Sequence, residues 1–210
     1  DKNIYLAAKA YSIGSNYVTP TLRRDFRAGG NDNLTFVFDT YQDNTNGFLF
    51  GSNPYGVMRE GQLFNGATNN SYANFFWDNK WKCASKIYEG YFINEISIPL
   101  ATLRYKENSK VWNFKCYRFD TQSNETSSLV RLPQSMLVMS LGYSIPIEFE
   151  QPLKKVGRNI SLIPYTSGNY SLDQINNIDN TTSNIGIDAK VGVTSGLNLD
   201  LTLNPDFSTV

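Results

Sequence analysis

The fold is decided by the stretch Asn33–Glu60, which has the sequence NLTFVFDTYQDNTNGFLFGSNPYGVMRE and predicts a β-hairpin. The apolar side chains of its first half recur at every second position: they are Leu34, Phe36 and Phe38. This period of two is typical of a half-buried strand. The Asp and Asn residues of Gln42–Gly47 favour a turn, in which Gly47 would supply a positive φ. The chain then returns as a strand over Phe48–Gly51.

The acidic, Asn-rich turn of this hairpin offers oxygen ligands to a cation. Asp39, Asp43 and Asn46 could bind Ca²⁺, but a Ca²⁺ site needs about six oxygens or more. The turn offers few, so a solvated turn is the simpler interpretation. We therefore predict no metal and no other cofactor.

The pattern of short strands and polar turns continues on both sides of this hairpin. Further strands are predicted over Ile4–Tyr11, Lys80–Tyr88, Tyr91–Ile98 and Val111–Asp120. Glu60–Asn74 is rich in Asn and Gly and predicts a long loop, and Gln122–Ser128 predicts a polar one. Regular short strands with almost no helical periodicity indicate an all-β fold, an antiparallel β-sandwich.

Composition excludes several functional classes. The net charge is 0 and no basic run stands out, so the footprint of a nucleic-acid-binding protein is absent. Histidine is also absent, which removes Ser-His-Asp and Cys-His catalysis and the usual His-ligated zinc sites. Carboxylates are present, but no spacing pairs them as glycoside hydrolysis requires. We predict no catalytic residue and expect that the protein is not an enzyme.

The two cysteines each fall on the apolar side of a predicted strand. Buried thiols at Cys83 and Cys116 are the simpler interpretation. A disulfide stays open, because sequence alone cannot establish the distance between the two Cα atoms.

The pattern changes near Pro152. A polar connector leads to a predicted strand, Ile160–Gly168, and then to Asn169–Asn184, which lacks apolar periodicity and predicts a long exposed loop. Ile185–Thr194 and Leu197–Asn204 alternate strictly between aliphatic and polar residues. Each has about the ten residues that an outer-membrane strand needs. Alternation alone fits equally a soluble hairpin whose aliphatic face packs on a core.

Five motifs, in order along the chain, carry a resemblance to a known family. They are FDTYQDNTNGFLFGSNPYG within the opening hairpin, WDNKW (Trp77–Trp81), EISIPLATLRY (Glu95–Tyr105), VWNFKCYR (Val111–Arg118) and LDLTLNPDFSTV (Leu199–Val210). The chain resembles Bacteroidetes outer-membrane proteins that join a family-9-like carbohydrate-binding domain to a DUF5916-type membrane β-barrel.

The resemblance implies two domains. Residues 1–152 would form the carbohydrate-binding-like β-sandwich, without its N-terminal start, and residues 153–210 the first strands of a transmembrane β-barrel. Because three strands cannot close a barrel, the remaining strands are expected beyond Val210.

The aromatic cluster around Trp77 and Trp81 is the candidate ligand-binding site. Sugars stack their C–H faces on aromatic rings, and Arg59, Glu60 and Asp78 would bond the hydroxyl groups. In the alternative interpretation, both Trp side chains fill the core, as most large aromatic residues do.

The resulting hypothesis is an outer-membrane β-barrel protein whose sandwich binds or takes up a glycan. The alternatives are a structural plug or docking module without a sugar ligand and, more weakly, a glycoside hydrolase. Expected partners are outer-membrane lipid, a glycan and other outer-membrane proteins, and no nucleic acid. Periplasmic turns of such barrels are short and outer loops are long. Thr194–Gly196 should therefore face the periplasm and Asn169–Asn184 the outside, which places the N-terminal domain in the periplasm.

Overall fold

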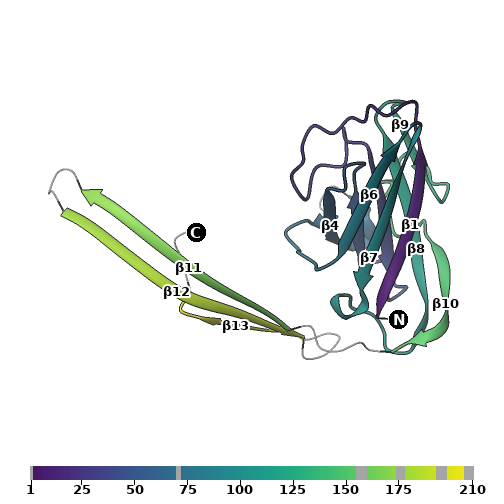
Figure 1. The fold of residues 1–210 in the computed structure, drawn as a ribbon. Coiled ribbons are helices and arrows are strands. Elements are labelled where there is room, and N and C mark those ends of the chain that lie inside the picture. Colours follow the sequence, from purple (N-terminus) through teal and green to yellow (C-terminus); the bar gives the residue numbers. More distant parts are fainter. Residues whose placement is uncertain (1, 70–71, 155–159, 174–177, 193–197, 206–210) are drawn as a thin grey trace. The chain divides into compact units, whose positions relative to one another are not determined.

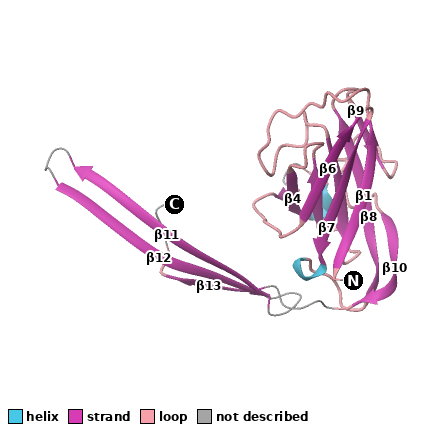
Figure 2. Ribbon diagram, viewed as in Figure 1, coloured by secondary structure: helices cyan, strands magenta, loops and turns pink. Residues whose placement is uncertain are grey.

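The structure, a computed structural model, describes residues 2–69, 72–154, 160–173, 178–192 and 198–205. These residues form antiparallel strands and two short 3₁₀ helices, η1 (Asn65–Ala67) and η2 (Leu100–Thr102) (Figures 1 and 2). The chain divides into two compact units, Asp1–Val156 and Gly157–Val210. Within the described ranges, no helix is long and apolar enough to cross a bilayer.

The first unit contains a three-stranded sheet, which we call sheet A. Its strands lie in the order β1 (Asn3–Tyr11), β7 (Tyr91–Pro99) and β6 (Lys82–Tyr88). The strands predicted over Lys80–Tyr88 and Tyr91–Ile98 are confirmed, and they pair as a hairpin. It turns at Gly90, whose φ of 76° is a conformation that favours glycine.

A larger sheet, sheet B, lies behind sheet A in Figure 1. Its strand order is β10 (Ile145–Leu153), β8 (Ser109–Asp120), β2 (Asn33–Asp39), β3 (Gly47–Ser52), β4 (Met58–Leu63) and β5 (Ala73–Asn74), and β9 (Glu125–Ser128) also pairs with β8. The hairpin of β2 and β3 is the predicted one. The all-β, antiparallel prediction is thus confirmed.

The long loop predicted over Glu60–Asn74 is wrong in part. Residues Met58–Leu63 pair with β3, and Ala73–Asn74 pairs with β4. The charged residues of β4 made this segment resemble a loop in the sequence. It still forms a strand, because the backbone hydrogen bonds between strands depend little on side-chain polarity. The polar loop predicted over Gln122–Ser128 likewise contains β9.

The main core lies between the two sheets. Sheet A contributes alternate residues of all three strands, and sheet B contributes the inner face of its central strands. Trp112 of β8 is fully buried there, with its ring centroid 6.0 Å from that of Phe38 and 5.4 Å from that of Tyr105. These rings and their aliphatic neighbours hold the sandwich together through apolar burial.

The outer face of sheet B is covered as well. Val37 and Leu49 belong to a second core with Tyr117 of β8 and with Leu141, which lies in the segment before β10. As a result every residue of β2 is buried. The half-buried strand predicted from the period of two is therefore wrong, because the covering segment was not expected.

The turn between β2 and β3 also differs from the prediction. Gln42 and Asn44 adopt the positive φ values, 58° and 54°, whereas Gly47 does not. Gly47 is needed for close approach instead, since a Cβ there would lie 2.8 Å from the carbonyl oxygen of Phe38. The Asp39 carboxylate accepts hydrogen bonds from the backbone N–H groups of Asp43 and Asn44. The described residues contain no group of three or more metal-ligating side chains.

Both cysteines are free and partly buried. Cys83 and Cys116 pack against the main core. Burial raises the pKa of the Cys83 thiol and raises the pKa of Cys116 to about 12. Both thiols are therefore protonated at neutral pH, which makes them poor nucleophiles.

The second unit is a three-stranded sheet, sheet C, in the order β11 (Ile160–Asp173), β12 (Ile178–Gly192) and β13 (Asn198–Leu203). The long loop predicted over Asn169–Asn184 is wrong, because β11 extends to Asp173, β12 begins at Ile178, and the two pair residue by residue. Ser, Thr and Asn in this segment hid the strands, since polar residues on both faces leave no period of two. The predicted turn Thr194–Gly196 lies outside the described residues.

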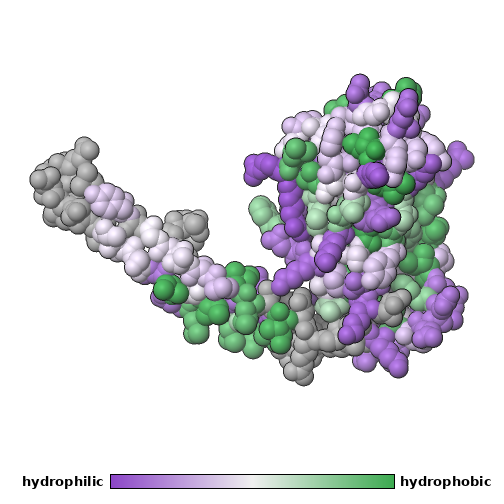
Figure 3. Space-filling view, in the orientation of Figure 1, coloured by the Kyte–Doolittle hydropathy of each residue, from purple (hydrophilic) through white to green (hydrophobic). Residues whose placement is uncertain are grey.

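One face of sheet C is aliphatic on all three strands. Directly paired residues share a face, and the register aligns three rows. They are Ile160–Val191–Leu199, Leu162–Ala189–Leu201 and Pro164–Ile187–Leu203. The leucines of β13 are exposed, and Figure 3 shows apolar residues gathered along one part of this unit. The predicted alternation is thus confirmed for the described residues of β12 and β13, whose aliphatic side chains share one face.

On the opposite face of sheet C, Tyr165 lies over Gly186, its direct partner in the register. A Cβ on Gly186 would lie 2.3 Å from the Tyr165 ring. The Tyr165 hydroxyl donates a hydrogen bond to the backbone oxygen of Asn204, at 2.8 Å. This ring therefore spans the whole sheet.

A buried lysine on the outer face of sheet B predicts a pH dependence of stability. The Lys115 Nζ donates a hydrogen bond to the Ser140 carbonyl oxygen, at 2.9 Å, and burial lowers the pKa of Lys115 from 10.5 to about 8. Between these values the unfolded chain binds the proton and the folded chain does not, so the folded state gains stability as pH rises.

We expect wild type to gain stability relative to Lys115→Met as pH rises from about 8 to 10.5. The measurement is the difference between the two melting midpoints, taken across this pH range. A difference that stays constant would show that Lys115 keeps its ordinary pKa in the folded protein.

Candidate functional site

The structure places Trp77, Trp81 and Glu60 around Phe50, but the five residues predicted to bind a ligand differ in burial. Trp81 is 6% exposed, and Arg59 and Glu60 are buried. Only Asp78 is exposed, and Trp77 is partly buried. A ligand in solvent therefore reaches few of these side chains.

Glu60 serves a structural ion pair. It lies on the inner face of sheet B, opposite Phe50 in the register. Its Oε1 accepts hydrogen bonds from the Arg24 guanidinium and from the backbone N–H of Asn79. The Arg24 guanidinium also donates to the Asn79 carbonyl oxygen, so it connects the loop before β2 with the segment before β6.

Arg59 points away from Glu60, because consecutive residues of a strand face opposite sides of a sheet. Its guanidinium carbon lies 4.4 Å from the centroid of the Phe75 ring, on the outer face of sheet B. Arg59 and Glu60 therefore cannot bind the same small ligand. Adjacency in sequence suggested a joint role that the pleat of β4 does not allow.

Trp77 packs against the edge of the main core. Its ring centroid lies 5.2 Å from that of Phe48 and 6.0 Å from that of Phe50. These contacts cover part of the Trp77 ring surface on which a sugar would have to stack. A role for Trp77 and Asp78 in ligand binding stays a prediction.

The outer face of sheet A combines exposed aromatic rings with polar side chains. The register of the three strands arranges this face in four rows. They are Tyr5–Ser97–Lys82, Ala7–Glu95–Ala84, Lys9–Ile93–Lys86 and Tyr11–Tyr91–Tyr88. Each row runs across β1, β7 and β6.

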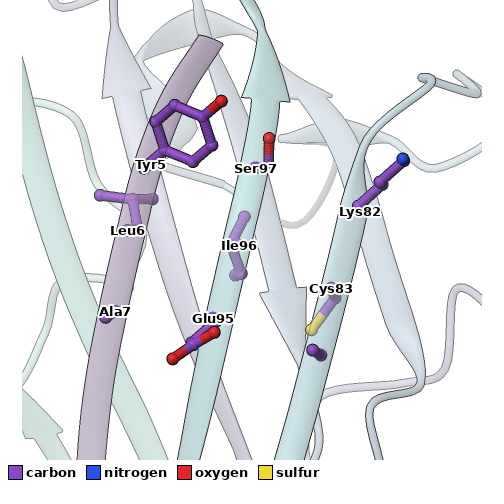
Figure 4. A pocket seen from close by; sticks show the side chains of 9 residues that line it. Tyr5, Leu6, Ala7, Lys82, Cys83, Glu95, Ile96 and Ser97 are labelled. Atoms are coloured by element: carbon purple, nitrogen blue, oxygen red, sulfur yellow. The ribbon is translucent and has the colours of Figure 1, made fainter.

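A trough of about 560 Å³ lies at the first two rows. Its second row carries small side chains, because the register places Ala7 and Ala84 on either side of Glu95. Figure 4 shows Tyr5, Lys82, Glu95 and Ser97 at the trough. Tyr5, which is 68% exposed, and Lys82 stand on either side of Ser97 in the first row. Large exposed side chains therefore border a floor of small ones, with a carboxylate in the middle.

The hydrogen-bonding groups at this trough are open to a ligand. Asn3 donates a hydrogen bond through Nδ2 to the Ser97 hydroxyl, at 3.0 Å, which leaves that hydroxyl free to donate its own proton. Glu95 is exposed and offers acceptor oxygens. Lys82 offers donors, so the trough can bond hydroxyl groups in both directions.

The last row forms an aromatic patch at the other end of the face. The rings of Tyr88 and Tyr91 stack with centroids 4.8 Å apart. Tyr11, which is 66% exposed, lies next to them with its centroid 6.1 Å from that of Tyr91. The face thus carries aromatic groups at both ends.

Sequence reasoning missed this face because it looked for the densest aromatic cluster. The signal available in the sequence was the period of two in β1, where Tyr5, Lys9 and Tyr11 alternate with inward-facing aliphatic residues. Only the pairing of three strands, which brings Glu95 between two alanines, makes a site of it. That pairing depends on long-range register, which the sequence does not show.

Comparisons with known proteins cover the two units differently. The sequence model of a domain of unknown function, DUF5916, matches residues 158–210. The expected resemblance to DUF5916 proteins is thus confirmed for this segment. No curated protein matches the sequence.

One similar solved structure is the crystal structure of a "putative carbohydrate-binding protein" from Bacteroides uniformis. It is 14% identical, with a TM-score of 0.48. The match covers 74% of this chain and 69% of that one.

Replacing the two tryptophans should separate a core role from a surface role. We expect Trp81→Ala to cost about 3–5 kcal/mol in the free energy of unfolding, as for other buried Trp side chains. Trp77→Ala should cost less, because Trp77 is only partly buried. Urea denaturation of both variants measures the difference. An equal or smaller loss for Trp81→Ala would contradict the burial described here.

Proposed function

We propose that the first unit binds a glycan at the trough on the outer face of sheet A. The observation that carries the proposal is the exposed Tyr5 ring beside a floor of small residues that holds Glu95. We further propose that sheet C lies in the lipid of a bacterial outer membrane.

The trough has the chemistry that a sugar ring requires. A sugar has apolar C–H faces and a rim of hydroxyl groups, so it suits a rigid amphipathic ring with hydrogen-bonding neighbours. Tyr5 supplies such a ring, which combines contact area with few rotatable bonds. Ser97 lies beside Tyr5 in the same row, and Glu95 lies in the next row. The volume of about 560 Å³ also lies within the range of small-molecule sites.

The trough favours binding over glycoside hydrolysis. Hydrolysis by the common mechanism needs two carboxyl groups that converge on one bond. Among the described residues that line the trough, Glu95 is the one carboxylate. A structural plug or docking module would instead present a broad contact surface, whereas here small side chains lie beside the exposed Tyr5 and Lys82.

The aliphatic face of sheet C supports the membrane proposal. Its three rows contain only aliphatic residues and one proline, and the other face carries Asp188, Lys190, Asp200 and Thr202. Lipid on one side and water on the other would satisfy both faces. An open sheet leaves edge groups unpaired in lipid, so the proposal requires further strands to complete a barrel.

The same sheet suggests an orientation. Beyond the aliphatic rows, β11 and β12 stay paired over the mostly polar segments Ser167–Asp173 and Ile178–Asn184, whereas the opposite ends of these strands lie at the rows themselves. Long excursions of outer-membrane barrels face the outside. The start of β11 would then face the periplasm, and with it the glycan-binding unit. Lipid, a glycan and other outer-membrane proteins are the partners that this location offers.

Two substitutions test the glycan site. Tyr5→Ala and Glu95→Gln should each weaken binding of the best ligand from an oligosaccharide panel by about tenfold or more, since each removes a central contact. Titration calorimetry with the full chain measures the affinity. Tyr55→Ala is the matched control, because Tyr55 is 54% exposed away from the trough.

An unchanged affinity in Tyr5→Ala, or an equal loss in Tyr55→Ala, would exclude the trough as the binding site. Melting curves for all three variants should coincide with wild type, because the replaced side chains lie in solvent.

A second pair of substitutions tests the membrane face. Leu201→Arg, in the middle row of the aliphatic face, should destabilise membrane-embedded sheet C by about 2–4 kcal/mol. Thr202→Arg is its neighbour on the polar face and should be tolerated. The readout is the fraction of protein that stays in outer membranes after a carbonate wash. Equal retention of both variants would contradict lipid contact at Leu201.

The orientation is open to labelling on whole cells. In a background with Cys83→Ala and Cys116→Ala, Thr182→Cys should react with a membrane-impermeant maleimide and Lys154→Cys should not. The reverse pattern would place the glycan-binding unit outside the cell.

A further inference from the structure

The outer face of sheet A carries more positive than negative charge. Lys9, Lys82 and Lys86 project from it, against the single carboxylate of Glu95. All four side chains are exposed. Within the described part of the chain, none of the three lysines forms an ion pair. The face therefore presents ammonium groups without protein counter-ions.

Two of these ammonium groups are held over tyrosine rings. The Lys9 Nζ lies 3.8 Å from the ring centroid of Tyr91 and 4.7 Å from that of Tyr11. The Lys86 Nζ lies 5.2 Å from the centroid of Tyr88. Cation–π attraction of this kind orients an ammonium group without neutralising it. It also occupies the aromatic patch, so Tyr5 is the ring left to stack on a ligand.

Lys82 lines the trough, whereas Lys9 and Lys86 lie in the row beyond Glu95, with their ammonium groups over the rings of the aromatic patch. Lys9 and Lys86 belong to one row, with Ile93 between them, so their strands lie about 10 Å apart. Lys82 lies in the row on the other side of Glu95, four residues or about 13 Å along the strand from Lys86. Along the face, positive groups thus lie on both sides of Glu95: Lys82 at the trough, and Lys9 and Lys86 at the aromatic patch. A long anionic chain that runs from the trough to the patch could contact both, whereas Glu95 repels an anion between them.

We propose that the glycan bound here is acidic, a chain of uronic acid units whose carboxylates meet the lysines while a ring stacks on Tyr5. This inference rests on the proposed function and narrows it to one class of ligand. Glu95 would accept hydrogen bonds from sugar hydroxyls at the centre of the trough. A lysine ammonium suits this task, because it is a point charge on a flexible stem that adapts to one carboxylate.

An anionic membrane surface is the other partner that lysines and tyrosines could attract. The arrangement favours the glycan, because the floor of Ala7 and Ala84 is recessed between longer side chains. Glu95 in this floor would also face the lipid headgroups with the wrong sign. Vesicle binding is therefore included as an outcome of the test.

The experiment compares two ligands that share one sugar backbone and differ in whether its carboxylates are free or methyl-esterified. Oligogalacturonate and its methyl ester, which lacks the negative charges, are titrated into the full chain by calorimetry, with oligomannuronate and its ester as a second pair. We expect each acid to bind more tightly than its ester, with an affinity that falls as salt is added.

Substitution of the lysines gives the matched protein control. Lys9→Gln, Lys82→Gln and Lys86→Gln together should weaken binding of the acid roughly tenfold, since each exposed ion pair contributes a few-fold. The control triple, Lys106→Gln, Lys154→Gln and Lys190→Gln, removes as many exposed charges outside sheet A and should bind like wild type.

The outcomes separate the two proposals. Equal binding of acid and ester, lost in Tyr5→Ala, would overturn the acidic ligand and leave glycan binding intact. Absence of binding to every acid, ester and neutral oligosaccharide would overturn both. Lysine-dependent binding to vesicles of phosphatidylglycerol, without binding to the acids, would overturn the inference in favour of a membrane surface.

Discussion

Burial of the β2–β3 hairpin on both faces is the constraint on which the first unit depends. Phe38 faces the main core and Val37 the second core, so neither face of these strands can meet water or a ligand. Sheet B is therefore covered twice, once by sheet A and once by the segment before β10. Within the described residues of the first unit, sheet A is covered only on its inner face. The free face of the sandwich is thus fixed by the way the aromatic residues of β2 and β3 are distributed, before any binding residue is considered.

Strands with one wet face were predictable from the alternation of their residues. In β1, β6 and β7 most inner residues are apolar and most of the charged and tyrosine residues face outward, so the period of two is visible. The β2–β3 hairpin was predicted from the same period, although both of its faces are buried. β4 was missed because Arg59 and Glu60 interrupt the pattern, although both are buried and held by the Phe75 ring and by Arg24. The polar part of β11 and β12 was missed for a similar reason, since its strands pair through the backbone without the alternating apolar residues by which a strand is recognised in a sequence.

The candidate site was beyond sequence prediction for a different reason. Trp77 and Trp81 stood out by residue type, and residue type mainly reports burial. Tyr5, Glu95 and Lys82 are separated by long stretches of chain and carry no motif. They meet because β1 and β6 both pair with β7 in one particular register. A binding face made from single residues of three strands is a property of that register, and each of these residues taken alone looks like ordinary solvated surface.

The contact between Tyr165 and Gly186 has a consequence for how sheet C assembles. Along its aliphatic rows the sheet is repetitive, and similar residues at every second position would allow the strands to pair in several alignments. A slip by one residue would turn the aliphatic rows of one strand to the polar side. A slip by two would keep the faces but press the Tyr165 ring against a residue with a side chain. Because Gly186 has no side chain, the Tyr165 ring fits over it in the observed alignment and would clash in the neighbouring ones. This one contact therefore fixes the register of two strands whose other residues are too similar to do so.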